Sequence, residues 1–238
     1  SETGVAGLTL GGGTGWLVRK YGLTCDHLLS AEVVTADGRT LIANNIENKD
    51  LFWGLRGGGG NFGIVTSFEY RAHEVKRVFG GVIAHPRSAA REVLRFYRDF
   101  MRDAPELLTA YCGMLTTVDG IPTVSILACY CGDSSTGERV LKPLRDFGSP
   151  LADTLAEIPR LDMQTMVDPA FPYGNRNYWK SSFVGDLSDE AIDIMVEVAG
   201  RMESPLSTVL CEYYYGAAGR IGETETAFSQ RASHYNIG

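Results

Sequence analysis

The pattern of hydrophobic and polar positions changes near residue 76. Before that point, short strand-like segments lie at residues 28–35, 40–43 and 62–70. After it, strand-like runs alternate with stretches in which apolar side chains recur every three or four positions, the spacing of an amphipathic helix. We therefore predict two domains, residues 1–75 and residues 76–238.

Glycine clusters punctuate the first region, at positions 4 and 7, 11–13 and 15, and 57–60 and 63. Glycine weakens helix and strand interiors, so such clusters need a reason. One reason is a close approach of the backbone to a ligand such as a phosphate group, which bare N–H groups can receive. The other is tight turning between packed strands. The pattern alone leaves both open.

Short elements are expected between these clusters. Residues 4–15 favour loop and short strand, and Trp16–Tyr21 favour a helical turn that Gly22 ends. Residues 36–39, Ala-Asp-Gly-Arg, predict a hairpin turn between two strands. Asn48 is placed to cap a short helix with its side chain.

The second region predicts strand pairs and helices that return on one side. Strands are expected at residues 78–84, 107–117, 123–131, 150–158, 178–184, 208–215 and 233–237. Helices are expected after Ser88, at a capping box that starts at Ser135, at residues 161–167 and after Ser188. Together these imply an antiparallel sheet covered on one face. The first domain would meet the other face, with a ligand cleft between them.

Composition and charge exclude several kinds of protein. The net charge of −7 argues against a nucleic-acid partner, and no apolar run is long enough to span a membrane. Five cysteines without a Cys-x-x-Cys pair and four scattered histidines argue against a disulfide framework and a metal site. Buried thiols are the expectation for Cys129 and Cys131, which favours a reducing, cytoplasmic location. Oligomeric state is left open.

One glycine motif matches nucleotide-binding patterns but lies in the wrong structural context for them. Gly58–Gly63 match G-x-G-x-x-G and, with Val65, the glycine loop of protein kinases. A dinucleotide motif follows a strand and opens a helix, whereas here a helix precedes and a strand follows. The other kinase motifs are missing, as are a Walker A sequence and a G-x-S-x-G elbow. All four interpretations are rejected.

Three segments taken together carry a specific resemblance: GVAGLTLGGGTGWLVRKYGLTCDHLL, AEVVTADGR and DLFWGLRGGGGNFGIVTSFEYRAHEV. Through them, residues 3–75 resemble the FAD-linked oxidases of the vanillyl-alcohol-oxidase (PCMH-type) superfamily, in particular the berberine-bridge-enzyme-like branch. Residues 76–238 resemble the family's substrate domain more loosely. The resemblance implies an α+β fold, in which the second half of a PCMH-type FAD-binding domain precedes an incomplete substrate domain. An antiparallel sheet with helices on one face would form that substrate domain.

The resemblance also implies FAD as cofactor, a small organic substrate such as an alcohol, a sugar or a secondary metabolite, and dioxygen as the electron acceptor. The family's histidine and cysteine that bond covalently to flavin would lie upstream of Ser1, and a further flavin-contacting segment would follow Gly238. The chain begins without methionine and stops within a β-like alternation. We therefore expect a piece of a longer protein that is inactive alone.

The resemblance further implies which backbone would meet FAD. The positions concerned are Thr3, Gly4 and Gly7 at the pyrophosphate and ribityl chain, Gly11, Gly12, Gly13 and Gly15 beside the cofactor, and Gly63 and Ile64 at the adenine. Asp26 would either position the loop near the flavin or make an ordinary structural hydrogen bond.

Polar side chains on predicted strands are candidates for the base that receives a substrate proton. Tyr178 and Lys180 share one face of strand 178–184, and Glu212 and Tyr214 share one face of strand 208–215. Asn236 matches a polar family position. Polar groups on apolar strands are costly unless exposed or paired, so they line a cavity or form ordinary salt bridges and solvated edges.

Two hypotheses from different classes follow. The first is an FAD-dependent oxidoreductase. The second is a flavin-free remnant of such an enzyme that binds a small molecule or a partner.

Overall fold

The computed structural model describes residues 3–171 and 174–238. Its contacts define two compact units, one running to Glu74 and including Tyr215–Ala232, the other made of Val75–Tyr214 and Ser233–Gly238. A single boundary near residue 75 placed Tyr215–Ala232 in the second domain. The segment clusters with the first unit because side chains there hold its backbone: Trp53 Nε1 donates to Thr224 O at 2.7 Å and Arg56 Nη2 donates to Glu225 O at 2.9 Å.

The first unit contains an antiparallel sheet in the order β2-β1-β3. Its strands are β1 (Leu28–Val34), β2 (Thr40–Asn44) and β3 (Ile64–Tyr70). Ala31 and Val33 of β1 are buried in one cluster with Phe52 and Leu55 of helix α3 (Lys49–Leu55). The predicted strands and hairpin are thereby confirmed, and Gly38 has the left-handed φ of +80° that the turn requires.

Helix α1 (Val5–Leu10) corrects the prediction of loop and short strand over residues 4–15. Leu8 N donates to Gly4 O and Gly11 N donates to Gly7 O, each at 3.2 Å. The glycines at positions 4, 7 and 11 argued against a helix, because glycine has a low helix propensity. Helix propensity is a weak guide where tertiary context favours the helical conformation. The predicted helical turn α2 (Val18–Tyr21) is confirmed, and Gly22 ends it at φ +103°.

The start of α3 was predicted correctly, but its capping mechanism was wrong. Asn48 takes the left-handed conformation, and its side chain caps no helical N–H. Instead, Asn48 Nδ2 donates to Ile42 O at 2.7 Å, which ties the helix start to β2. Two 3₁₀ turns complete this unit, η1 (Thr24–His27) and η4 (Ala217–Arg220).

The second unit is built on an antiparallel sheet in the order β7-β4-β6-β5-β10-β11-β9, with β8 also paired to β4. The strands are β4 (Arg77–Pro86), β5 (Leu108–Thr116), β6 (Pro122–Tyr130), β7 (Ala152–Asp153), β8 (Ala156–Pro159), β9 (Ser182–Val184), β10 (Val209–Tyr213) and β11 (Tyr235–Ile237). The predicted antiparallel sheet is confirmed.

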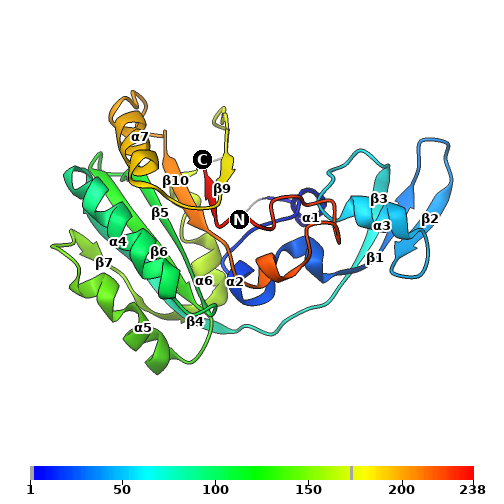
Figure 1. The fold of residues 1–238 in the computed structure, drawn as a ribbon, viewed down its shortest axis with the longest axis horizontal. Helices are drawn as coiled ribbons and strands as arrows, with labels where there is room; N and C mark the ends of the chain where they lie inside the picture. Colours follow the sequence, from blue (N-terminus) through cyan, green and yellow to red (C-terminus); the bar gives the residue numbers. More distant parts are fainter. Residues whose placement is uncertain (1–2, 172–173) are drawn as a thin grey trace. The chain divides into compact units, whose positions relative to one another are not determined.

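Helices α4 (Ala90–Asp103), α5 (Ser134–Asp146) and α7 (Asp189–Gly200) pack on one face of this sheet, whereas α6 (Arg160–Thr165) lies on the other (Figure 1). A Cβ placed on Gly137 of α5 would lie 2.8 Å from the Cβ of Phe79, and one on Gly80 would lie 3.1 Å from the sulfur of Met163 in α6. Successive strand residues point to opposite faces. The long helices therefore cover one face, as predicted, and a short helix meets the opposite face.

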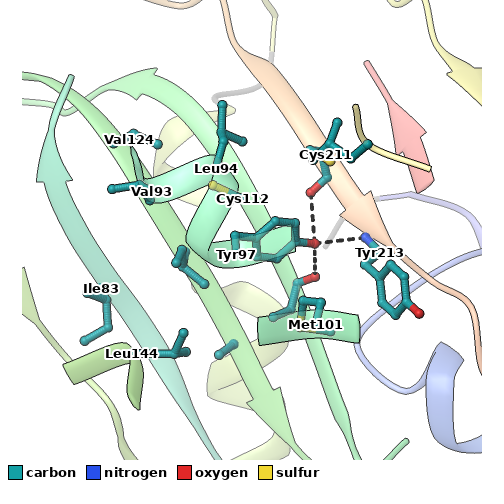
Figure 2. Close-up of a cluster of buried hydrophobic side chains, with 14 of the residues drawn as sticks. Ile83, Val93, Leu94, Tyr97, Met101, Cys112, Val124, Leu144, Cys211 and Tyr213 are labelled. Atoms are coloured by element: carbon teal, nitrogen blue, oxygen red, sulfur yellow. Dashed lines mark hydrogen bonds between the residues drawn. The ribbon is translucent and has the colours of Figure 1, made fainter. Parts of the chain in front are cut away.

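Tyr97 joins α4 to the sheet beneath it (Figure 2). Its hydroxyl donates to Ala110 O of β5 at 2.7 Å and accepts from Tyr213 N of β10 at 3.0 Å. The ring is fully buried among the apolar side chains of the core, and burial raises the pKa of Tyr97 well above its ordinary value. Because the hydroxyl is satisfied, this polar group is tolerated in an apolar core.

Several predicted boundaries and caps in the second unit were wrong. The strand expected over residues 178–184 pairs only at Ser182–Val184, and β10 ends before Tyr214. Asp133, not the box at Ser135, caps α5 by accepting from Thr136 N at 2.8 Å.

The other two helix starts differ from each other. Ser88 lies in the 3₁₀ turn η2 (Arg87–Ala89) and does not cap α4. Ser188 caps α7 as predicted, accepting from Ala191 N at 3.2 Å. A further 3₁₀ turn, η3 (Asp168–Ala170), precedes the segment that leads to β9.

Candidate functional site

A pocket of about 170 Å³, called here the Glu212 pocket, lies within the second unit beside β10 and β11. Its lining residues are Trp179, Lys180, Ser181, Leu210, Glu212, Asn236 and Gly238. Of the predicted catalytic candidates, Lys180, Glu212 and Asn236 thus share one pocket. They come from three segments that are distant in sequence, so the sheet is what brings them together.

Strand register places Glu212 and Asn236 side by side. They are directly opposite each other on the antiparallel pair β10–β11, so their side chains share one face. Asn236 Nδ2 donates to Glu212 Oε2 at 2.9 Å. Burial raises the pKa of the Glu212 carboxyl, and the hydrogen bond from Asn236 opposes that rise. A carboxylate with a raised pKa and a fixed orientation is suited to accept a proton near neutral pH.

Tyr111 of β5 is a residue that sequence reasoning missed. It lies opposite Glu212 on the other side of β10, and burial together with the Glu212 charge raises the pKa of the Tyr111 hydroxyl well above its ordinary value. Its strand was predicted correctly. Tyr111 is identified only by the pairing register of β5 and β10, which places it opposite Glu212. The sequence of either strand alone does not reveal that register.

Tyr178 and Tyr214 lie outside the lining of the Glu212 pocket, as far as the described residues show. Tyr178 precedes β9 and is 83% exposed. Tyr214 follows β10 and is buried, with its ring edge-on to Phe183 at a centroid distance of 5.8 Å. The strand prediction failed at both residues, and the catalytic roles given to them stay predictions.

The glycines of the first unit fall into two groups. At Gly4, Gly7 and Gly15, an added Cβ would meet no atom within 4 Å, and at Gly11 it would make only ordinary contacts. Thr3 is exposed beside the first of these. Backbone at these positions is open to close approach by a ligand, which fits a flavin cofactor.

The second group has a reason inside the protein. Gly12 and Gly13 have φ values of +106° and +86°, and an added Cβ would lie 2.6 Å from Phe228 Cδ2 or 2.7 Å from Thr24 Oγ1, respectively. Gly63, at φ +145°, would collide with Val34 O. The tight-turn alternative therefore describes these glycines. Their approach to FAD stays a prediction, as does that of Ile64, which is 72% exposed at the start of β3.

Asp26 makes a structural ion pair. Both of its carboxylate oxygens accept from Arg231, at 2.6 and 2.9 Å, and Oδ2 also accepts from Leu23 N at 2.8 Å. The structural alternative for Asp26 is thus observed, whereas a position near flavin stays a prediction. Arg231 was not singled out from the sequence, because nothing local to it indicates a partner near residue 26.

The FAD binding domain family matches residues 1–44. An FAD-linked oxidoreductase of Dictyostelium discoideum is 30% identical over 100% of this chain and 52% of its own length. The (R)-6-hydroxynicotine oxidase of Paenarthrobacter nicotinovorans is 31% identical over 75% of this chain and 40% of its own length. This chain belongs to the FAD-linked oxidoreductases.

Solved structures of this family share the fold. Glucooligosaccharide oxidase from Acremonium strictum matches with a TM-score of 0.79 and 26% identity, over 99% of this chain and 53% of the other. The berberine-bridge-enzyme-like 1 protein of Physcomitrella patens matches with a TM-score of 0.82 and 25% identity, over 99% and 54%. The predicted superfamily, branch and fold class are confirmed, and so is FAD as the family cofactor.

This chain spans about half the length of the curated relatives it matches. Its relatives are named oxidoreductases and oxidases, which confirms the predicted enzyme class by family relationship. In the residues that the structure describes, no helix combines the length and hydropathy that crossing a membrane requires.

Proposed function

We propose that this chain forms part of an FAD-dependent oxidase of a small organic substrate, with Glu212 as the base. The observation that carries the proposal is a partly buried carboxylate, fixed by Asn236 and lining a pocket, in a chain of an FAD-linked family. One relative is a glucooligosaccharide oxidase and another a 6-hydroxynicotine oxidase. These names support an alcohol, a sugar or a nitrogen-containing metabolite as the class of substrate.

The open glycines are the residues proposed to hold the cofactor. Gly4, Gly7 and Gly15 carry no side chain and leave room beside the backbone, so N–H groups there can meet pyrophosphate or ribityl oxygens. The chemistry that FAD supplies when bound is acceptance of an electron pair at N5 from the substrate, with dioxygen as the final acceptor.

Glu212 has the chemical role on the protein side. Its carboxylate is proposed to take the proton that leaves a substrate hydroxyl or amine. Asn236 Nδ2 holds Oε2 in place at 2.9 Å, so the other oxygen is left to face the substrate. Trp179 and Leu210 supply apolar lining to the same pocket.

Replacement of Glu212 tests the base. In the FAD-loaded full-length protein that contains this chain, Glu212→Gln should lower kcat by about 10²- to 10⁴-fold, the usual contribution of general-base catalysis. Because burial raises the pKa of Glu212, kcat of the unmodified protein should fall as pH drops through that raised pKa. Lys142→Gln, at an exposed position of α5, should leave kcat unchanged. A Glu212→Gln protein with the original kcat would refute the assignment.

Flavin binding is tested separately by titrating FAD into the chain and following flavin fluorescence and the visible spectrum. Saturable binding supports the oxidoreductase proposal. A chain that stays colourless and ignores added FAD favours the flavin-free alternative for this chain, though not for a longer protein that contains it.

A further inference from the structure

Two of the four histidines, although far apart in the sequence, meet in the first unit and are called here the histidine pair. His27 is the last residue of the turn η1, and His73 lies in the segment that follows β3. His27 Nδ1 and His73 Nε2 are 3.1 Å apart, which is a hydrogen-bond distance. The two rings meet edge to face with their centroids 4.7 Å apart. Neither the open glycines nor the Glu212 pocket includes these residues.

Tyr21 of α2 packs against the histidine pair. Its ring stacks on the ring of His73, with centroids 4.0 Å apart and planes inclined by 18°, and it meets the ring of His27 edge-on at 6.4 Å. The ammonium of Lys20 lies 4.9 Å from the centroid of the Tyr21 ring. His27 is half-buried, whereas His73 is exposed. Three segments of the first unit therefore meet in this cluster.

The histidine pair holds the stretch through which the chain first leaves the first unit. That unit runs to Glu74, and β4 of the second unit begins at Arg77. Residues 71–76 form neither helix nor strand. Arg71 N donates to His27 O at 2.8 Å, and the His73 ring is hydrogen-bonded to the His27 ring. His27 thus holds this stretch twice, once through its backbone and once through its side chain.

A hydrogen bond between two imidazoles requires one nitrogen that carries no proton. A neutral imidazole has one donor and one acceptor nitrogen, whereas an imidazolium has two donors and no acceptor. With one extra proton on the pair, the bond persists as a charge-assisted N–H···N contact, and the Tyr21 ring faces the cation. With two extra protons, N–H groups of like charge would face each other. The bonded pair therefore holds at most one extra proton, and the separated pair holds two.

The surrounding groups do not supply a countercharge for the second proton. Burial and the neighbouring His73 lower the pKa of His27, and Arg71 lowers it further. The Asp26 carboxylate and the Tyr21 carbonyl act in the opposite direction. Both oxygens of Asp26 are already engaged in the buried ion pair of η1. Acid therefore acts on the contact between the two imidazoles.

We propose that the histidine pair is an acid-sensitive contact, which holds residues 71–74 against η1 at neutral pH and releases them when both imidazoles are protonated. The bonded state binds one proton fewer than the released state. Its population relative to the released state therefore falls with pH, by up to about tenfold per pH unit. Neither FAD nor Glu212 takes part, so this inference is independent of the proposed function.

Amide hydrogen exchange, followed by NMR on the whole 238-residue chain, tests the proposal. The reporter is the Arg71 N–H, which is protected only while the stretch is held on His27. Its protection factor, corrected for the intrinsic pH dependence of exchange, should fall at least about fivefold between pH 7.5 and 5.0. The Gly58 N–H, which donates to Gly54 O at 2.9 Å in the same unit, reports general loosening and should lose less protection.

Two substitutions at His73 separate the hydrogen bond from its titration. His73→Gln supplies an amide oxygen that accepts from a protonated His27, so protection at Arg71 should stay high and vary little with pH. His73→Phe keeps a ring on Tyr21 but removes both nitrogens, so protection at pH 7.5 should already approach the acid value of the unmodified chain. His234→Gln, in the second unit, is the matched control and should reproduce the unmodified pH dependence.

Three results would overturn the proposal. The first is a protection factor at Arg71 that follows that of Gly58 at every pH. The second is a pH dependence that His73→Gln retains in full. The third is unchanged protection at pH 7.5 in His73→Phe. Because His73 is exposed, both variants should fold, and His73→Gln decides the matter if His73→Phe does not.

Discussion

The guanidinium of Arg231 donates to both carboxylate oxygens of Asp26, from Nη1 to Oδ2 at 2.9 Å and from Nη2 to Oδ1 at 2.6 Å. Both side chains are buried, with 1% and 5% of their surface exposed. The same nitrogens also reach Ala218 O at 3.0 Å and Thr226 Oγ1 at 2.8 Å. Within the first unit, this network fastens Tyr215–Ala232 to the turn that precedes β1.

Asp26→Asn should strongly destabilise the first unit. The substitution leaves a buried guanidinium facing a neutral amide, and breaking a buried ion pair from one side costs about 3–5 kcal/mol. Urea unfolding followed by circular dichroism should show a lower midpoint. Asp37→Asn in the exposed Asp37–Arg39 pair is the matched control and should change the midpoint little. An unchanged midpoint in Asp26→Asn would show that the network is dispensable.

Tyr97→Phe tests the connection between α4 and the sheet. It removes the hydroxyl that bridges Ala110 O and Tyr213 N and leaves these groups without that partner in a buried site, at a cost of about 1–3 kcal/mol. The midpoint of urea unfolding should fall accordingly. Removal of the exposed hydroxyl in Tyr178→Phe should have no such effect. Equal midpoints for the two variants would contradict the assignment.

Acid should destabilise the folded chain through its histidines. His85 is buried beside Phe147, its Nε2 has no hydrogen-bond partner in the described residues, and burial lowers its pKa. The unfolded chain takes up this proton near the ordinary pKa of about 6.5, whereas the folded chain does so only at lower pH. The free energy of unfolding therefore falls as pH drops below about 6.5.

Urea midpoints at pH 7.5 and 5.5 measure this effect. The midpoint should be lower at pH 5.5, and His85→Leu should narrow the difference between the two. A residual difference is expected in that variant, because burial lowers the pKa of His27 and His234 as well. The same difference with and without His85 would exclude it as a contributor.

Valine at Gly12 and at Gly15 should have different effects. At Gly12, a Cβ would lie 2.6 Å from the Phe228 ring at a φ of +106°, so Gly12→Val should lower the unfolding midpoint even without flavin. At Gly15, nothing lies within 4 Å, so Gly15→Val should keep the midpoint and weaken FAD binding. Urea unfolding and FAD titration of both variants separate packing from cofactor contact. Normal FAD binding by Gly15→Val would refute the role proposed for Gly15.

Local chemistry made much of the fold predictable. The hairpin at residues 36–39 and the cap at Ser188 each depend on neighbours in sequence, and both formed as expected. The segment before β9 shows the limit. Residues 178–181 have strand-like composition, but in the structure only Ser182–Val184 pair with β11, through Tyr235–Ile237. Composition alone does not set which residues of a strand pair, because pairing requires a neighbouring strand in register.

Individual residues of the candidate site could be predicted from the sequence, but the contacts between them could not. Glu212 and Asn236 each stood out as polar positions on apolar strands, yet the bond between them depends on the β10–β11 register. Tyr111 and Arg231 were missed because their partners lie about a hundred or more positions away in the sequence. Glycines presented the opposite difficulty, since ligand approach and tight packing favour the same residue type.

Strand β11 lies between β10 and β9 in the sheet, although it follows both in the sequence. Ribosomal synthesis proceeds from the amino terminus, so β9 and β10 are made before β11, the strand that pairs with both of them. Until Asn236 leaves the ribosome, Glu212 lacks its amide partner and β9 lacks its neighbour. The Glu212 pocket should consequently be unable to form in a nascent chain until β11 has been synthesised.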